Sequence, residues 1–343
     1  MKILTYIYGL LLVLAVAACG KEDDLIGGKV DFSMPYVIED NPNDPIQHRR
    51  YELYKKYDVP VFFNDTIKET FVGEDHYVNP IYQYETLDMN WDFTSHTGGS
   101  VSSEYAYITL PEEQNEALDF VETYLSLCSK RMRPFCLFVT KSATMISGDQ
   151  ETDKEYLQNF RVLLLANVLG IPEENIETRC KEMINSMVLG KVQNDADVVA
   201  RFGSVSSTEN WYGRAWKSDD PSAGALGCSY QYTGEWWSSP NDFYQEGNLE
   251  DLMHYANCTT EEEAIAVREN ILKDIGQFGF ICGDEYIGFM ESPTEEYDLK
   301  FYVNTIMATG REEFLNRYGM SPLVVEKFEI LATFIEDELG VEL

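Results

Sequence analysis

The feature that most constrains the fold is a fully apolar run followed closely by an amphipathic helix. Residues 162–166 are five consecutive aliphatic side chains, which is typical of a strand buried on both faces. After a break at Gly170-Ile171-Pro172, apolar residues recur at the three- and four-residue spacing of a buried helical stripe. The stripe consists of Ile176, Cys180, Met183, Ile184, Met187 and Val188. The chain must therefore contain a sheet and a helix that directly follows one of its strands.

The other apolar patterns predict strands in the first half of the chain and mostly helices in the second. Strands are expected at 59–63, at 134–140 and, from strict alternation, at 87–93. Helices are expected from Pro45, from Pro111 to Lys130, and from the capping box of Thr260 and Glu263. Two more follow the Ser-Pro pairs 292–293 and 321–322 and end near Gly310 and Gly340. The predicted class is α+β, as a single domain over residues 44–343.

The amino end predicts export to a membrane surface. Residues 1–18 combine Lys2 with an apolar run too short for a comfortable membrane span, as in a signal peptide. The small residues before Cys19 resemble a lipobox, which implies cleavage there and acyl chains such as palmitate on Cys19. An ordinary signal peptide with an incidental Cys is the alternative. The cluster 21–24 resembles the surface-export signal of Bacteroidota lipoproteins, so we expect an outer-membrane lipoprotein that faces the exterior.

Composition excludes several classes of partner. Against 26 Lys and Arg stand 59 Asp and Glu, a formal net charge of −33, so nucleic acid and anionic lipid are not expected partners. Residues 19–43, rich in Gly, Pro and Asn, are expected to form a flexible tether behind the lipidated Cys. The six other Cys are widely spaced and lie mostly in apolar runs, which predicts buried free thiols.

The amphipathic helix carries a pattern that resembles a metal site with its metal ligands replaced. Zinc peptidases of the H-E-x-x-H type place two His four residues apart on a helix, with Glu between them as the base. Residues 181–185 keep Glu182 in that frame, but Lys181 and Asn185 occupy the two His positions. A solvated Glu among polar neighbours is the simpler interpretation of this spacing alone.

The order of elements resembles the zinc-binding metallopeptidase lipoproteins of Bacteroidota, also described as substrate-import-associated zinc metallohydrolases. The similar segments are the lipidated amino end, residues 51–61, the helix 111–130 leading into 134–140, the strand 161–168 leading into the Lys181 helix, and the tail 327–343. The resemblance implies a zincin-like α+β fold, with Lys181 and Asn185 at degenerate metal positions. A second acidic motif of the family is similar to residues 250–254, where His254 replaces its last acidic position.

These replacements imply a member of the family that has lost its metal. A charged Lys has no free lone pair, and an Asn amide is a poor zinc ligand beside imidazole. Without metal no bound water is activated, so Glu182 is expected to be vestigial and no cofactor is predicted. Zinc would enter only if this interpretation of the degenerate motif is wrong. The four His, at 48, 76, 96 and 254, show no ligand spacing.

An aromatic-rich loop region, residues 203–246, supplies the expected ligand-binding residues. It contains Trp211, Trp216, Trp236, Trp237 and Tyr244 among many Gly, Ser, Asp and Pro. Rings of this kind stack on sugar rings or peptide side chains, and nearby carboxylates accept hydroxyl or cationic groups. The alternative is that the Trp side chains fill the core of the second half.

The preferred function is therefore a surface-exposed, non-catalytic binding protein. It would hold a glycan or peptide polymer and assist nutrient import by a TonB-dependent importer. Enzymatic activity stays open, because a zinc-dependent or carboxylate-dependent hydrolase is one alternative and a glycosidase needs only two carboxylates. A purely structural surface scaffold is another. Motifs of serine hydrolases, Walker A and dinucleotide binding are absent from the sequence.

Overall fold

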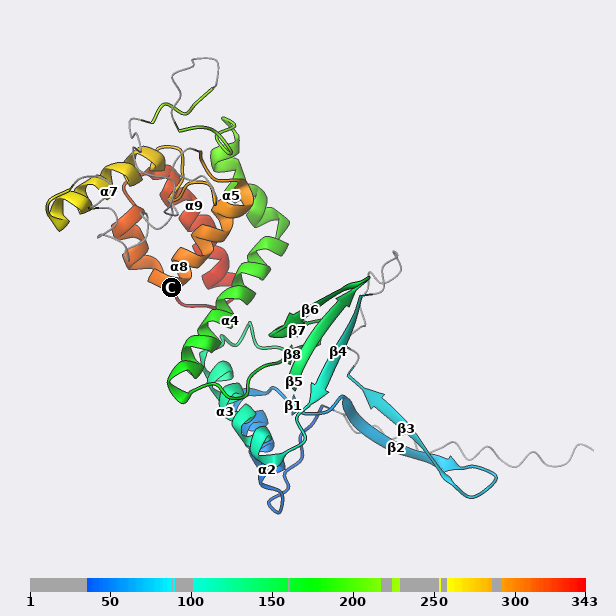
Figure 1. Cartoon of the computed structure of the whole chain (residues 1–343). Helices are drawn as coiled ribbons and strands as arrows, with labels where there is room; N and C mark the ends of the chain where they lie inside the picture. Colours follow the sequence, from blue (N-terminus) through cyan, green and yellow to red (C-terminus); the bar gives the residue numbers. More distant parts are fainter. Residues whose placement is uncertain are drawn as a thin grey trace, which may run out of the picture. The chain divides into compact units, whose positions relative to one another are not determined.

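A computed structural model describes residues 36–87, 89, 101–159, 161–216, 224–228, 253, 258–285 and 291–343. The chain divides into two compact units, Met1–Gln114 with Phe135–Asn167, and Asn115–Pro134 with Val168–Leu343. The α+β class is confirmed, with the strands in the first half and a helical second half (Figure 1). Within the part of the chain described, no helix has the length and apolarity needed to cross a bilayer.

The sheet of the first unit is organised around one long strand, β5. Its amino-terminal half pairs in parallel with β1 and β8, and β7 adds an antiparallel edge to β8. Its carboxyl-terminal half pairs antiparallel with β4 and β6. The strands are β1 (Val61–Phe62), β4 (Val101–Tyr107), β5 (Cys136–Ser147), β6 (Gln150–Lys154), β7 (Tyr156–Gln158) and β8 (Val162–Leu165). The two apolar runs of the sequence are thus neighbouring buried strands, as predicted.

A single apolar cluster forms the core of this unit. It gathers Phe62, Phe138 and Leu164 from the three parallel strands, with Tyr51 and Tyr54 of α2 (Pro45–Tyr57) packed against it. The helix α2 begins as predicted, because the Asp44 carboxylate accepts two backbone N–H groups of the first turn.

The alternation at 87–93 gave a wrong prediction where it can be compared. Leu87 and Met89 are buried in the same core cluster but lie outside any strand. The remaining residues of that stretch, 88 and 90–93, are outside the described part. The alternation of apolar side chains here reflects which residues are buried, and it does not indicate a strand.

A two-stranded hairpin, β2 (Thr66–Glu74) and β3 (Pro80–Thr86), was not predicted. Its strands pair only with each other among the described residues, and every residue of β3 is exposed. Both faces of β3 meet solvent, so no buried apolar stripe marks this strand. Phe71 of β2 and Tyr82 of β3 nevertheless make an aromatic contact across the hairpin, and Tyr82 and Tyr84 make one along β3.

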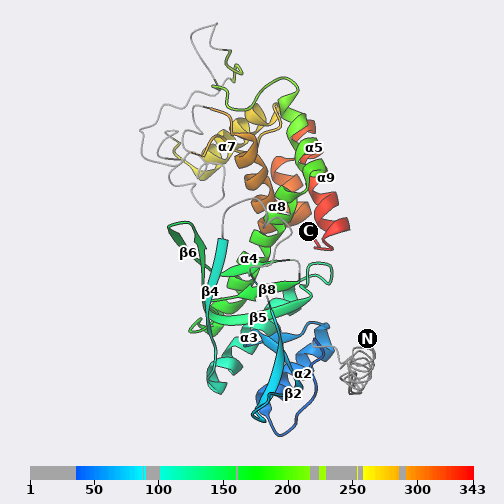
Figure 2. The same cartoon turned by 90° about the vertical axis from the view of Figure 1, so that its right-hand side faces the viewer.

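The second unit is a helical assembly. Its elements are α3 (Pro111–Leu127, beginning in the first unit), α4 (Glu173–Asn194), α5 (Ala196–Ser207), α7 (Glu261–Gly276), α8 (Glu295–Tyr318), α9 (Pro322–Thr333) and a π-helical turn, Phe334–Glu338. The predicted stripe of α4 is buried except for Ile176, which is half-buried. Cys180 of this stripe lies 3.8 Å from the carbonyl oxygen of Phe120 on α3. Figure 2 shows α5 and α9 lying alongside each other, in agreement with their contacts.

Two further sequence predictions are confirmed. The Glu263 N–H donates to the Thr260 hydroxyl at 3.2 Å and the Thr260 N–H donates to the Glu263 carboxylate at 3.3 Å, which is the expected capping box of α7. The six Cys at 128, 136, 180, 228, 258 and 282 are free thiols, and all but the half-buried Cys258 are buried.

A fully buried charge lies at the centre of the second unit. The Lys327 ammonium of α9 is 2.6 Å from the Asp298 carboxylate of α8, and both side chains are 0% exposed. Four aromatic rings surround the ammonium nitrogen, with centroid distances of 4.7–5.7 Å: Phe202, Tyr212, Phe280 and Tyr302. Ring faces stabilise a desolvated cation, so this cage compensates part of the loss of hydration.

The helix α8 contains a sharp break at Gly310. The sequence predicted that a helix ends there, and the backbone does leave the helical region at Gly310 before a second helical segment continues to Tyr318. Gly310 has φ 75° and ψ 177°, a backbone region that is essentially restricted to glycine. A Cβ at this position would also lie 3.2 Å from the carbonyl carbon of Leu343. The glycine therefore supplies the non-helical backbone conformation that joins two helical segments at a sharp bend.

We expect Gly310→Ala to lower the free energy of unfolding by about 1–3 kcal/mol, because alanine is strained at this backbone conformation. The matched control is Gly190→Ala in the interior of α4, where an added Cβ meets nothing within 4 Å. That change should raise the free energy of unfolding by about 0.5–1 kcal/mol. Chemical denaturation followed by circular dichroism measures both. Equal effects of the two substitutions would contradict the assigned role of Gly310.

Candidate functional site

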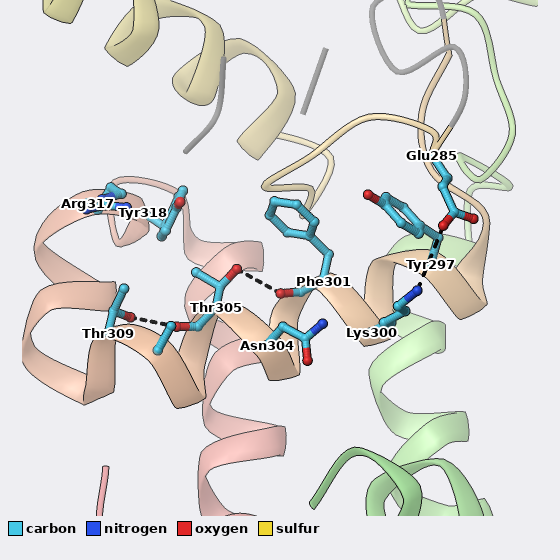
Figure 3. Close-up of a pocket in the computed structure, with 10 residues that line it drawn as sticks. Glu285, Tyr297, Lys300, Phe301, Asn304, Thr305, Thr309, Arg317 and Tyr318 are labelled. Carbon is cyan, nitrogen blue, oxygen red and sulfur yellow. Dashed lines mark hydrogen bonds and ion pairs between the residues drawn. The ribbon is translucent and has the colours of Figure 1, made fainter. Parts of the chain in front are cut away.

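A pocket of about 500 Å³ lies along α8 in the second unit (Figure 3). Its lining is mixed, with aromatic rings, hydroxyls, an amide and charged groups. The lining residues are Glu285, Tyr297, Lys300, Phe301, Asn304, Thr305, Ala308, Thr309, Arg317 and Tyr318. All but Glu285 belong to α8, so a single helix with a bend provides most of this site.

Helical spacing and the break at Gly310 together form the pocket. Side chains from 297 to 309 recur every three or four residues and so share one face of the helix. Beyond the break, the last turns bring Arg317 and Tyr318 to the end of the pocket near Thr309 (Figure 3). Lys300 and Tyr297 lie at the opposite end. The pocket therefore depends on a backbone conformation that Gly310 supplies.

Each cation at the pocket has a carboxylate neighbour. The Lys300 ammonium lies 3.8 Å from Glu285 and 5.9 Å from the centroid of the Tyr297 ring. The Arg317 guanidinium donates to Glu313 at 3.0 Å. The charges of the pocket are thus nearly balanced, although the whole chain is strongly acidic. Such partly exposed pairs are weak, and a polar ligand can exchange hydrogen bonds with them.

The middle of the pocket offers uncharged polar groups. The Thr305 hydroxyl donates to the Phe301 carbonyl at 2.7 Å and the Thr309 hydroxyl donates to the Thr305 carbonyl at 2.8 Å. These bonds use the hydroxyl protons and leave oxygen lone pairs as acceptors. Asn304 is exposed, and its side-chain amide makes no hydrogen bond within the described part of the chain. An amide donates and accepts, so Asn304 can bind a hydroxyl group in either sense.

The aromatic side chains complete the wall. Tyr297 is half-buried, whereas Phe301 and Tyr318 are buried. Burial raises the pKa of Tyr318, while the nearby Arg317 acts in the opposite direction. The Tyr318 phenol therefore stays protonated at neutral pH. Aromatic rings thus form one side of the pocket, and hydroxyl and amide groups line its floor.

A second hollow, of about 620 Å³, lies between α3 and α4 and is acidic. Five carboxylates line it: Glu116, Asp119, Glu122, Glu173 and Glu177. Glu116 accepts a hydrogen bond from the Gly170 N–H at 2.6 Å. A hydrogen bond from Lys181, with its positive charge, lowers the pKa of Glu177. Among the residues described, no three His, Cys, Asp or Glu side chains are grouped so that they could hold a metal ion.

The degenerate motif lies on the exposed side of α4. The Lys181 and Glu182 side chains are 60% and 58% exposed, and each is paired along the helix. Lys181 binds Glu177 at 2.7 Å, and Glu182 accepts from Arg179 at 3.0 Å. Asn185 is half-buried, and none of the three motif residues lines either hollow. Their geometry is that of a solvated helix face, the simpler interpretation of the sequence pattern.

The predicted aromatic platform is described only in part. Trp216 is 5% exposed and its ring packs against Phe280, while the half-buried Trp211 contacts Phe278 at 5.3 Å. Trp216 therefore belongs to the core, because its large apolar ring is buried against Phe280. Trp236, Trp237 and Tyr244 lie outside the described residues, as do Cys19 and His254. For these positions the sequence prediction stays a prediction.

Sequence reasoning missed the α8 pocket. The available signal was the three- and four-residue spacing of Tyr297, Phe301, Asn304 and Thr305 on one predicted helix. That spacing does not reveal a hollow, because one end of the pocket is closed by Arg317 and Tyr318, beyond the break at Gly310.

We expect Lys181→Ala and Glu182→Gln each to change the free energy of unfolding by less than about 0.5 kcal/mol, because their ion pairs are exposed. The matched control is Lys327→Met, which leaves Asp298 buried without its partner and should cost about 3–5 kcal/mol. Denaturant titration gives all three values. A large loss on Lys181→Ala would show that the motif is part of a buried network.

Comparison with known proteins finds no family model that matches this chain, no similar curated protein and no similar solved structure. The zincin-like fold and the family resemblance therefore rest on the residues quoted from the sequence.

Proposed function

We propose that this protein is a non-catalytic, lipid-anchored binding protein of the outer-membrane surface that holds a glycan and assists its import. The observation that carries the proposal is the α8 pocket, with its aromatic wall and uncharged polar floor. In this proposal the fold is zincin-like, Cys19 carries the lipid, and residues 19–43 are the tether. A TonB-dependent importer would receive the ligand.

The chemistry of the pocket favours a neutral sugar. A pyranose ring has apolar C–H faces that pack on aromatic rings such as Tyr297, and hydroxyl groups that suit Asn304 and Thr305. Lys300 and Arg317 each have a carboxylate neighbour, so a ligand with a net charge would have to compete with these pairs. The overall charge of −33 further disfavours anionic ligands.

The lining residues favour binding over hydrolysis. A glycosidase needs two carboxylates across the scissile bond. Among the described lining residues, Glu285 is the one carboxylate, and it is paired with Lys300. Glu182, the expected relic of a catalytic base, lies outside the pocket on the exposed face of α4. A bound sugar would therefore meet hydrogen-bonding groups without an acid-base pair.

Calorimetry of the full chain in detergent against neutral and uronic-acid oligosaccharides tests this proposal. We expect binding of a neutral oligosaccharide, weakened about tenfold by Tyr297→Ala or Asn304→Ala, which corresponds to about 1.4 kcal/mol. The matched control is Tyr84→Ala, an exposed ring on β3 of the first unit, which should leave the affinity unchanged.

Two outcomes would contradict the proposal. Sugar binding that survives both pocket substitutions would remove the α8 pocket as the site. Turnover of an oligosaccharide by the purified chain would replace binding with hydrolysis, and loss of that turnover on Glu182→Gln would restore the motif as a catalytic element.

A further inference from the structure

The buried pair of Lys327 and Asp298 has a geometry that permits more than an ion pair. The Lys327 Nζ lies 2.6 Å from the Asp298 Oδ2, and both side chains are completely shielded from solvent. The Tyr212 hydroxyl donates to the same Oδ2 at 3.0 Å and accepts from the Lys327 Nζ at 3.0 Å. An amine, a carboxyl group and a proton-carrying phenol therefore meet in one closed space.

The environment is poorly suited to two stable charges. The other carboxylate oxygen, Asp298 Oδ1, is buried without a hydrogen-bond partner. A carboxylate oxygen left in this state is costly, whereas the oxygen of a neutral acid or amide is less so. The rings of Phe202, Phe280 and Tyr302 exclude water from the ammonium nitrogen. Burial therefore favours any reaction that removes both charges.

The protonation of the two groups also favours loss of both charges. Burial raises the pKa of Asp298 and lowers the pKa of Lys327, while their mutual attraction opposes both shifts. Transfer of one proton from Nζ to Oδ2 across the 2.6 Å hydrogen bond converts the ion pair into a neutral amine and a neutral acid. A neutral lysine amine in an apolar site is a nucleophile, and a neutral carboxylic acid is a much better electrophile than a carboxylate.

We propose that Lys327 and Asp298 condense into an intramolecular isopeptide bond that joins α9 to α8. The Lys327 Nζ forms a bond to the Asp298 Cγ, and the bond from Cγ to Oδ2 breaks. One proton from the amine leaves with the carboxyl OH as water, so atoms and electrons balance with no oxidant or cofactor. The products are one secondary amide and one water molecule.

Tyr212 is placed to move the proton in this step. Its hydroxyl contacts both the attacking nitrogen and the departing oxygen, so it can accept a proton from Nζ while it donates one to Oδ2. Asp298 Oδ1 becomes the amide oxygen and no longer carries charge. The fixed contact between the two groups removes the entropy cost of bringing them together.

A bond at this place would suit the rest of the chain. The six Cys from 128 to 282 are free thiols, so no disulfide joins the described helices. The linked residues are 29 positions apart and belong to consecutive helices. Closing such a loop restricts the unfolded chain, as a disulfide does. This inference does not depend on the proposed sugar binding, because it concerns a different cluster of residues.

Peptide mapping by mass spectrometry tests the proposal on the unmodified full chain. A protease that cleaves after Lys would release residues 274–300 and 301–327 as separate peptides from an unlinked chain. We expect instead no cleavage at Lys327 and one branched peptide, 274–300 joined to 301–343, lighter than the sum of its parts by one water. Fragmentation places the branch at Asp298 and Lys327.

The same map contains an internal control. Lys141 and Glu113 are also 2.6 Å apart, but their side chains are 53% and 24% exposed. That pair should give ordinary linear peptides, which shows that proximity without burial is insufficient. Tyr212→Phe should lower the branched fraction, and Lys327→Arg should abolish it. Linear peptides with normal cleavage at Lys327 in the wild-type chain would overturn the proposal and leave a buried ion pair.

Discussion

The second unit depends on the buried pair of Lys327 and Asp298. Lys327 brings α9 to Asp298 and Tyr302 of α8, to Phe202 of α5, and to the segments that carry Tyr212 and Phe280. Desolvating a lysine is expensive, and here one carboxylate, one phenol and four ring faces compensate it. Because all these groups must be in place together, the cluster specifies how the helices around it pack.

The same helix carries the core and the candidate site. Asp298 and Tyr302 of α8 point into the buried cluster, while Tyr297, Lys300 and Asn304 line the pocket. The helical period of 3.6 residues separates these two faces. The buried face holds α8 in position, and the break at Gly310 turns its last residues back to close one end of the pocket. The shape of the pocket therefore depends on the same helix packing that stabilises the unit.

Residues 181–185 of α4 lie apart from the α8 pocket. Lys181 and Glu182 form short-range ion pairs on the exposed side of α4, while the buried stripe of the same helix packs against α3. The stripe explains why the helix exists, whereas the motif residues are outside both hollows. A ligand-binding role is thus better supported by uncharged and paired groups on α8 than by Glu182.

Local signals in the sequence determined much of the secondary structure: Asp44 and Thr260 begin helices, and the apolar runs at 134–140 and 161–168 become adjacent buried strands. They determined the α+β class because hydrophobic periodicity and capping act over a few residues. The tertiary structure alone decided that Lys327 is buried, that Trp216 is core, and that α8 bends to form a pocket. These features depend on partners up to 115 residues away, such as Tyr212 beside Lys327, and no local pattern records such distant contacts.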